Sequence, residues 1–106
     1  MIFDLRIYTL QPAKLQLWLK FYEQNAFPIQ CRHLGPPVMF STTEVGVLNQ
    51  VVHMWKYDSQ ADREQRRGKM QLDPEWIAYL KKNAELGALV SFENRILKPT
   101  SFSPLA

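Results

Sequence analysis

The 106-residue sequence has few of the residues on which common active sites depend. Cys31 is its single cysteine, and His33 and His53 are its two histidines, so no internal disulfide can form and no zinc-ligand spacing occurs. The four glycines form no phosphate-binding loop, dinucleotide fingerprint or nucleophile elbow. We therefore predict neither a metal site nor a cofactor, and most common classes of cofactor-dependent enzyme are excluded.

The sequence also lacks long hydrophobic runs and a strong excess of one charge. Acidic and basic residues both fall within Ile2–Arg6, so we predict neither a signal peptide nor a membrane span. The formal charge is +3, and the local cationic run Arg63–Arg67 contains a glutamate, which is typical of a solvated helix face. We therefore predict no binding of nucleic acid and, with a single cysteine, a cytoplasmic location.

The stretch Glu44–Ser59 is the part of the sequence around which the rest is arranged. In an extended segment, side chains alternate between two sides. Both sides here contain apolar residues: one carries Leu48, Gln50, Val52, Met54 and Lys56, and the other carries Asn49, Val51, His53, Trp55 and Tyr57. We therefore predict a strand that is covered on both faces and lies centrally in its sheet.

Start and stop signals on either side of this stretch predict an α+β domain. The predicted elements are, in order, a strand at Ile2–Leu10, a helix from Pro12 that breaks at Pro28, a strand at Val38–Glu44, the central strand after a turn at Gly46, a helix from Ser59 to about Met70, a helix from Asp73 to Gly87, and a strand at Ala88–Leu97. This order is the ferredoxin-like split βαβ pattern, an antiparallel four-stranded sheet with helices on one face. Residues 1–98 then form a single domain, and residues 99–106 form an irregular tail.

The two faces of this sheet are expected to differ in character. We predict that the apolar side of the first strand, with Phe3, Leu5 and Ile7, and the apolar side of the last strand lie beneath the helices. The opposite face would carry Asp4, Arg6, Tyr8, Glu93 and Arg95, together with one side of the central strand. If Val51 and Trp55 were exposed there, they would form an apolar patch that monomers rarely tolerate. We therefore predict a homodimer in which two such sheets pair face to face.

Several segments resemble the NIPSNAP family. The central block carries the resemblance most specifically, and it extends over nearly the whole chain: Glu44–Gly46, Leu48–Trp55, Tyr57–Ser59, Asp62–Arg63, Asp4–Leu10, Asp73–Leu80 and Glu93–Pro99. One departure is Ala13, where the family usually has glycine. The resemblance implies a dimeric α+β barrel, in which two ferredoxin-like sheets enclose a shared barrel. It implies no defined activity, because a fold alone does not give a function.

Six side chains are candidates for ligand binding: Arg6, Tyr8, Asn49, His53, Trp55 and Glu93. His53 is the candidate catalytic residue, either as an acid–base group or as a group that orients a ligand. Alternatively, it is a buried histidine satisfied by the carboxylate of Glu93 or Asp4. We also predict that Arg6, Asn49 and His53 face a common polar cavity, because the first and central strands are neighbours in this fold.

Arg6 and the aromatic residues allow two interpretations each. Arg6 could bind a carboxylate substrate beside Asp4 or Glu93, or it could form part of a structural ion-pair network. The aromatic residues could line a cavity or belong to the core: Tyr8, Trp18, Trp55, Tyr57, Trp76 and Tyr79.

The function predicted from these features is that of a small homodimeric protein that binds a small molecule or a protein partner. The alternative is a cofactor-free enzyme of the monooxygenase type, acting on a small aromatic or apolar acid. Related barrels of the wider group include such oxygenases and haem-degrading proteins, whose substrates lie between the sheet and the helices.

Overall fold

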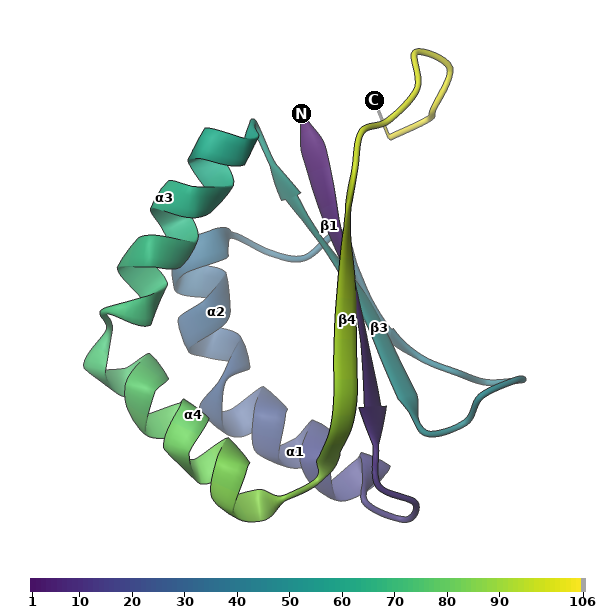
Figure 1. Cartoon of the computed structure of the whole chain (residues 1–106), viewed down its shortest axis with the longest axis vertical. Helices are drawn as coiled ribbons and strands as arrows, with labels where there is room; N and C mark the ends of the chain where they lie inside the picture. The colour runs from purple at the N-terminus through teal and green to yellow at the C-terminus, as the bar shows by residue number, and fades with distance from the viewer. Residues whose placement is uncertain (106) are drawn as a thin grey trace.

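A sheet and a layer of helices on one of its faces make up the chain (Figure 1). The computed structural model describes residues 1–105. Within them the elements are, in order, β1 (Ile2–Leu10), α1 (Leu15–Asn25), α2 (Phe27–Leu34), β2 (Met39–Thr42), β3 (Gln50–Tyr57), α3 (Gln60–Gln71), α4 (Pro74–Leu86) and β4 (Leu89–Leu97). The sheet has the order β2-β3-β1-β4 with antiparallel pairing throughout, which confirms the ferredoxin-like α+β fold.

The predicted signals at the ends of the later helices are confirmed. The Ser59 hydroxyl accepts a hydrogen bond from the Asp62 backbone N–H at 3.1 Å, so it caps α3. The Asp73 carboxylate accepts from the Glu75 N–H at 2.9 Å and caps α4. Gly87 ends α4 in the left-handed conformation, with φ of 64°.

The predicted break of the first helix near Pro28 is confirmed. Helix α1 ends at Asn25, and α2 begins at Phe27 with Pro28 in its first turn, where a missing N–H costs no hydrogen bond. Arg32 and His33 lie beyond this break, in the last turn of α2. Both donate to the Asp73 carboxylate at 2.7 Å, which joins α2 to the start of α4 and, with the His33 bond first, lowers the pKa of Asp73 to about 2.

The hairpin between β2 and β3 is longer than predicted. The two strands leave residues 43–49 as a loop that projects beyond the sheet (Figure 1). Gly46 in this loop has φ of 128°, a conformation that favours glycine. Residues 98–105 contain turns but no regular element, and the last residue of the predicted tail, Ala106, lies outside the described residues.

The predicted faces of the first strand were wrong, whereas Glu93 and Arg95 of β4 lie on the face opposite the helices, as predicted. Asp4 pairs with Trp55 and Arg6 pairs with His53, and these side chains face the helices, where Asp4 is fully buried. Leu5 and Ile7 lie on the open face instead. The register of β1 and β3 decides this outcome. Directly paired residues point to the same face, so the side of β1 that pairs with Val51, His53 and Trp55 faces the helices.

Large side chains fill the space between the sheet and the helices. Trp55 and Tyr57 of β3 are about 1% exposed, and they belong to one core cluster with Trp18 and Tyr22 of α1 and Tyr79 of α4. Trp18 stacks on Tyr22, with a centroid distance of 5.0 Å. None of the helices between residues 1 and 105 has both the length and the apolarity to cross a lipid bilayer.

Ala13 carries the fold's local strain, since among the described residues it alone combines a side chain with a positive φ, of 69°. Replacing Ala13 by glycine should raise the free energy of unfolding by about 1 kcal/mol, because glycine adopts this conformation without the Cβ clash. The matched control is Ala78→Gly in the exposed middle of α4, which should lower it by a similar amount. Urea denaturation of both variants measures the two signs, and destabilisation by both substitutions would contradict the strain at Ala13.

Candidate functional site

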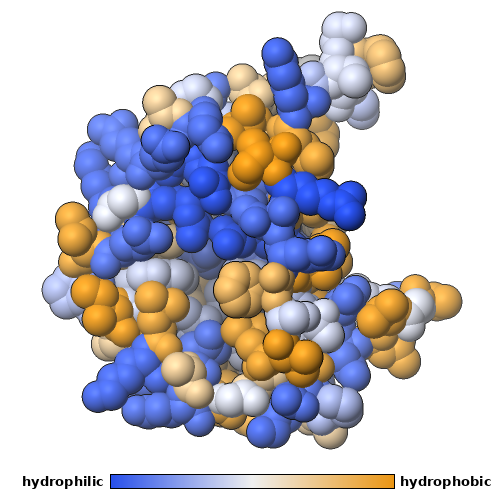
Figure 2. Space-filling model, in the orientation of Figure 1, coloured by the Kyte–Doolittle hydropathy of each residue, from blue (hydrophilic) through white to orange (hydrophobic). Residues whose placement is uncertain are grey.

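A cavity of about 220 Å³ lies between the sheet and the helices. We call it the sheet–helix cleft. Every helix and two strands contribute to its wall: Arg6 and Tyr8 from β1, Tyr22 from α1, Gln30 from α2, Arg67 and Gln71 from α3, Trp76, Tyr79, Leu80 and Asn83 from α4, and Leu89 and Phe92 from β4. Figure 2 shows strongly hydrophilic residues gathered between α3 and β4, with hydrophobic residues below them. The cleft is therefore polar at one end and apolar at the other.

Asp4 is the shared hydrogen-bond acceptor at the polar end of the cleft. Its side chain has no exposed surface, and it accepts hydrogen bonds from Arg63 Nε at 3.0 Å, Asn94 Nδ2 at 3.2 Å and an Arg6 guanidinium nitrogen at 3.4 Å. The donors come from α3, β4 and β1, so one carboxylate connects the helix layer with two strands. A buried carboxylate with this many donors is well satisfied.

Positive charge exceeds negative charge around the cleft. Arg6 and Arg63 both pair with the single carboxylate of Asp4, and Arg67 lies close enough to these two arginines for their charges to interact with its own; we call the three side chains the arginine cluster. Burial lowers the pKa of Arg67, and the neighbouring charges of Arg6 and Arg63 lower it further. The Nε of Arg6 is buried and has no hydrogen-bond partner within residues 1–105. The site thus contains donors and positive charge that the surrounding protein does not use.

His53 is enclosed directly beside Arg6. It has no exposed surface, its ring stacks on Phe40 at a centroid distance of 4.5 Å, and Tyr8 meets it edge-on at 4.7 Å. The predicted carboxylate partner was wrong, because Nδ1 accepts a hydrogen bond from the indole N–H of Trp55 at 2.7 Å. Burial, followed by the charge of Arg6, lowers the pKa of His53 to about 3.

The hydrogen bond from Trp55 fixes the tautomer of His53. An indole N–H can only donate, so Nδ1 carries the lone pair and the neutral ring carries its proton on Nε2. That N–H is buried and has no partner among the described residues. A neutral histidine whose only basic nitrogen is already bonded is better suited to a structural role than to general-base chemistry.

The structure brings together four of the six candidate residues. Arg6, Tyr8, His53 and Trp55 lie on the helix-facing side of β1 and β3, and Arg6 and Tyr8 line the cleft. Arg6 and His53 thus share a face as predicted, although that face is the one covered by the helices. Asn49 lies just before β3, where its carbonyl accepts from the Leu10 N–H at 2.8 Å. Glu93 pairs with Ile7 on the opposite face, so it is separated from Arg6.

The sequence reasoning missed the contribution of α3. Arg63 and Arg67 were assigned to a solvated face, yet both are only partly exposed and belong to the arginine cluster. Arg63, Arg67 and the fully buried Met70 lie at positions i, i+4 and i+7 of one helix face, and this spacing was the available signal. Gln30 was also missed; its buried side chain accepts a hydrogen bond from the Tyr22 hydroxyl.

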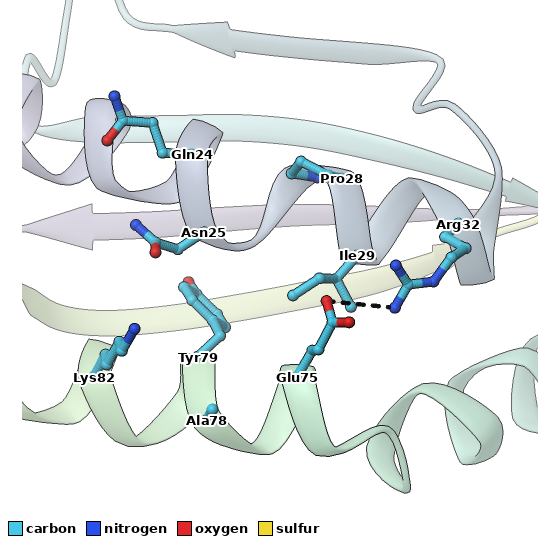
Figure 3. Close-up of a pocket in the computed structure, with 9 residues that line it drawn as sticks. All are labelled: Gln24, Asn25, Pro28, Ile29, Arg32, Glu75, Ala78, Tyr79 and Lys82. Atoms are coloured by element: carbon cyan, nitrogen blue, oxygen red, sulfur yellow. Dashed lines mark ion pairs between the residues drawn. The ribbon is translucent and has the colours of Figure 1, made fainter.

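A second cavity, of about 320 Å³, lies on the outer side of the helix layer (Figure 3). Side chains from α1 and α2 face those of α4 across it, and they include Asn25, Arg32, Glu75 and Lys82. Arg32 is already paired there, with Glu75 at 3.8 Å and with Asp73 at 2.7 Å. Among the described residues, the arginine of this outer groove is therefore already paired with carboxylates, unlike Arg67 of the cleft.

The fold and the cleft together define an α+β domain of ferredoxin-like topology with a polar and apolar cleft between its sheet and its helices. The NIPSNAP family model matches residues 3–104, and the chain belongs to the NIPSNAP family. Protein NipSnap homolog 3A of Homo sapiens is 34% identical over 74 residues, which are 70% of this chain and 30% of that protein. The chain thus spans about a third of the length of this curated relative.

Solved structures extend the comparison over the whole domain. A NIPSNAP family protein from Agrobacterium tumefaciens is 41% identical, with a TM-score of 0.92 over 99% of this chain and 98% of that one. A proposed antibiotic biosynthesis monooxygenase from Nitrosomonas europaea has a TM-score of 0.65 over 93% of this chain and 98% of that one, at 8% identity. The second likeness shows the fold alone.

The Asp4 carboxylate should be the most sensitive position in the site. Asp4→Asn removes the negative charge that balances Arg6 and Arg63, and we expect it to lower the free energy of unfolding by about 3–5 kcal/mol. The matched control is Asp58→Asn, an exposed aspartate just before α3, for which we expect a change within about 0.5 kcal/mol. Urea denaturation at neutral pH measures both. Equal effects of the two substitutions would contradict the central role of Asp4.

Proposed function

We propose that this NIPSNAP domain binds a small organic molecule in the sheet–helix cleft and that it does so as a homodimer. The observation that supports the first part is a partly open cavity with apolar wall residues and a few convergent polar groups, which is the usual composition of a ligand site. Its volume, about 220 Å³, lies below the range of about 300–1,000 Å³ that holds drug-sized ligands. The ligand is therefore a small metabolite.

Binding is the function that the site supports better than catalysis. The monooxygenase-type alternative depends on a likeness at 8% identity, which extends to the fold and no further. His53, the candidate catalytic residue, is buried and already accepts from Trp55 through Nδ1. The cleft instead contains donors that suit recognition, namely Arg6, Arg67 and Asn83.

The open face of the sheet supports the second part of the proposal. Leu5 pairs with Met54 and Ile7 pairs with Val52 on the side away from the helices, and all four are partly exposed (Figure 1). A contiguous apolar surface of this kind is rarely left in water by a monomer. A second copy can cover it through a two-fold axis, because each sheet then meets the same sheet in its partner.

The ligand proposal is tested by filling the cleft. Leu80 lines it and is 46% exposed, so Leu80→Trp adds volume to the cleft without opening the core. We expect small molecules that raise the melting temperature of the wild-type protein to lose this effect in Leu80→Trp. Ile77→Trp adds the same ring one turn earlier on α4, outside the cleft, and should leave binding intact. The cleft would be ruled out as the binding site if no small metabolite of the library stabilised any of the three proteins, or if the same metabolites stabilised all three equally.

The association proposal is tested by light scattering. The wild-type chain should have about twice its mass of 12.4 kDa at micromolar concentration. Val52→Lys places a charge on the open face, and we expect it to give monomers because an unpaired charge in an apolar interface is costly. Leu72→Lys, at a position 79% exposed between α3 and α4, is the control and should remain dimeric. A monomeric wild-type protein would remove the dimer from the proposal.

A further inference from the structure

We infer that the ligand of the sheet–helix cleft is a small organic monocarboxylate, with its carboxylate between Arg6 and Arg67 and its apolar part against Trp76, Leu80 and Phe92. This inference rests on the proposed function and names the chemical class of the ligand. Both arginines and all three apolar residues line the same cavity.

The charges in the cleft set the charge of the ligand. Two guanidinium groups line the cavity, and one of them, Arg6, shares the Asp4 carboxylate with Arg63. No ion pair within residues 1–105 joins Arg67 to a carboxylate. Within the described residues, Arg6, Arg63 and Arg67 thus have only the carboxylate of Asp4 between them, which leaves two positive charges without a counterion, and a ligand carboxylate between Arg6 and Arg67 would balance one of them.

The arrangement of the donors suits an anion held from two sides. Arg6 extends from β1 in the sheet and Arg67 from α3 in the helix layer, so the two guanidinium groups approach the cavity from different layers. Their mutual repulsion contributes to the lowered pKa of Arg67. A carboxylate between them replaces this repulsion with charge-assisted hydrogen bonds, and the planar guanidinium fork matches its two oxygens.

The apolar residues of the cleft wall determine the size and polarity of the rest of the ligand. Trp76, Leu80, Leu89 and Phe92 offer apolar surface that inorganic anions cannot use. The volume of about 220 Å³ is too small for a drug-sized molecule, so it suits one ring or a short branched chain. An aromatic or branched aliphatic monocarboxylate fits both ends of the cleft.

The inference is tested with matched acids and amides. Benzoate and benzamide have the same ring and nearly the same shape, and cyclohexanecarboxylate and its amide repeat the comparison without aromaticity. Calorimetric titration of the wild-type protein should show at least about tenfold tighter binding of each acid than of its amide, because the amide leaves the guanidinium groups without a counterion. Inorganic phosphate is the third probe and should bind more weakly than benzoate.

Arg67→Gln is the informative variant, since Arg67 makes no ion pair with Asp4 and its loss leaves the donors of Asp4 in place. We expect it to fold and to lose the preference for acids over amides. Arg66→Gln removes the same charge from the adjacent position, where the guanidinium bonds Asp62 and the Leu34 carbonyl instead, and should keep the preference.

The outcomes separate this inference from the function on which it rests. If acids and amides bind equally and both are lost in Leu80→Trp, the cleft binds ligands but the carboxylate assignment is wrong. A preference for acids that survives Arg67→Gln, or phosphate binding as tight as that of benzoate, would also overturn the assignment. If no probe and no metabolite of the library binds, the proposed function fails together with it.

Discussion

The burial of one carboxylate on the inner side of the sheet is the constraint on which the rest of the site depends. Asp4 lies in β1, next to the middle of the sheet, with no exposed surface. A buried charge is tolerated only when partners compensate it, so Arg63 must reach across from α3 and Arg6 must turn inward from the same strand. These requirements bring guanidinium groups between two layers that would otherwise meet through apolar contacts. The cleft exists where this polar arrangement interrupts the core.

Most buried polar side chains of the core are paired, and the unpaired atoms among the described residues, Arg6 Nε, His53 Nε2 and Tyr57 Oη, are not confined to the cleft. The polar groups of three large aromatic residues are hydrogen-bonded: Trp18 donates to Asn83 at 3.0 Å, Trp55 donates to His53 at 2.7 Å, and Tyr22 donates to Gln30. Buried polar atoms without a partner in the described chain are few, and one of them, Arg6 Nε, belongs to a residue of the cleft wall. Since buried polar groups are almost always satisfied, the unpaired Arg6 Nε beside a cavity is the kind of group that the proposed ligand would pair.

The order of elements and the ends of the helices could be predicted because they depend on local chemistry. Ser59, Asp73 and Gly87 act through their own backbone conformation and short side-chain contacts, and they need no tertiary information.

The faces of β1 could not be assigned in the same way. Its alternation separates an apolar side from a polar side, and burying the apolar side is the local expectation. The structure buries the polar side. Val51, His53 and Trp55 of β3 face the helices, and Asp4 and Arg6 face them too because they pair with Trp55 and His53. Arginines from distant α3 make this possible, and that compensation cannot be seen in β1 alone.

This inversion has a consequence for how the two surfaces of the sheet are related. Because side chains alternate along a strand, the residues that leave the core for the open face are Leu5 and Ile7, the neighbours in sequence of the residues that enter the cleft. The polar cleft and the apolar open face are therefore two sides of one strand, and a register shift by one residue would exchange them. The same pairing of β1 with β3 thus supports the proposed ligand site on one side and the proposed association surface on the other. The nine residues of β1 therefore contribute both to the proposed ligand site and to the proposed association surface, and the hydrophobic pattern of the strand alone does not indicate this double role.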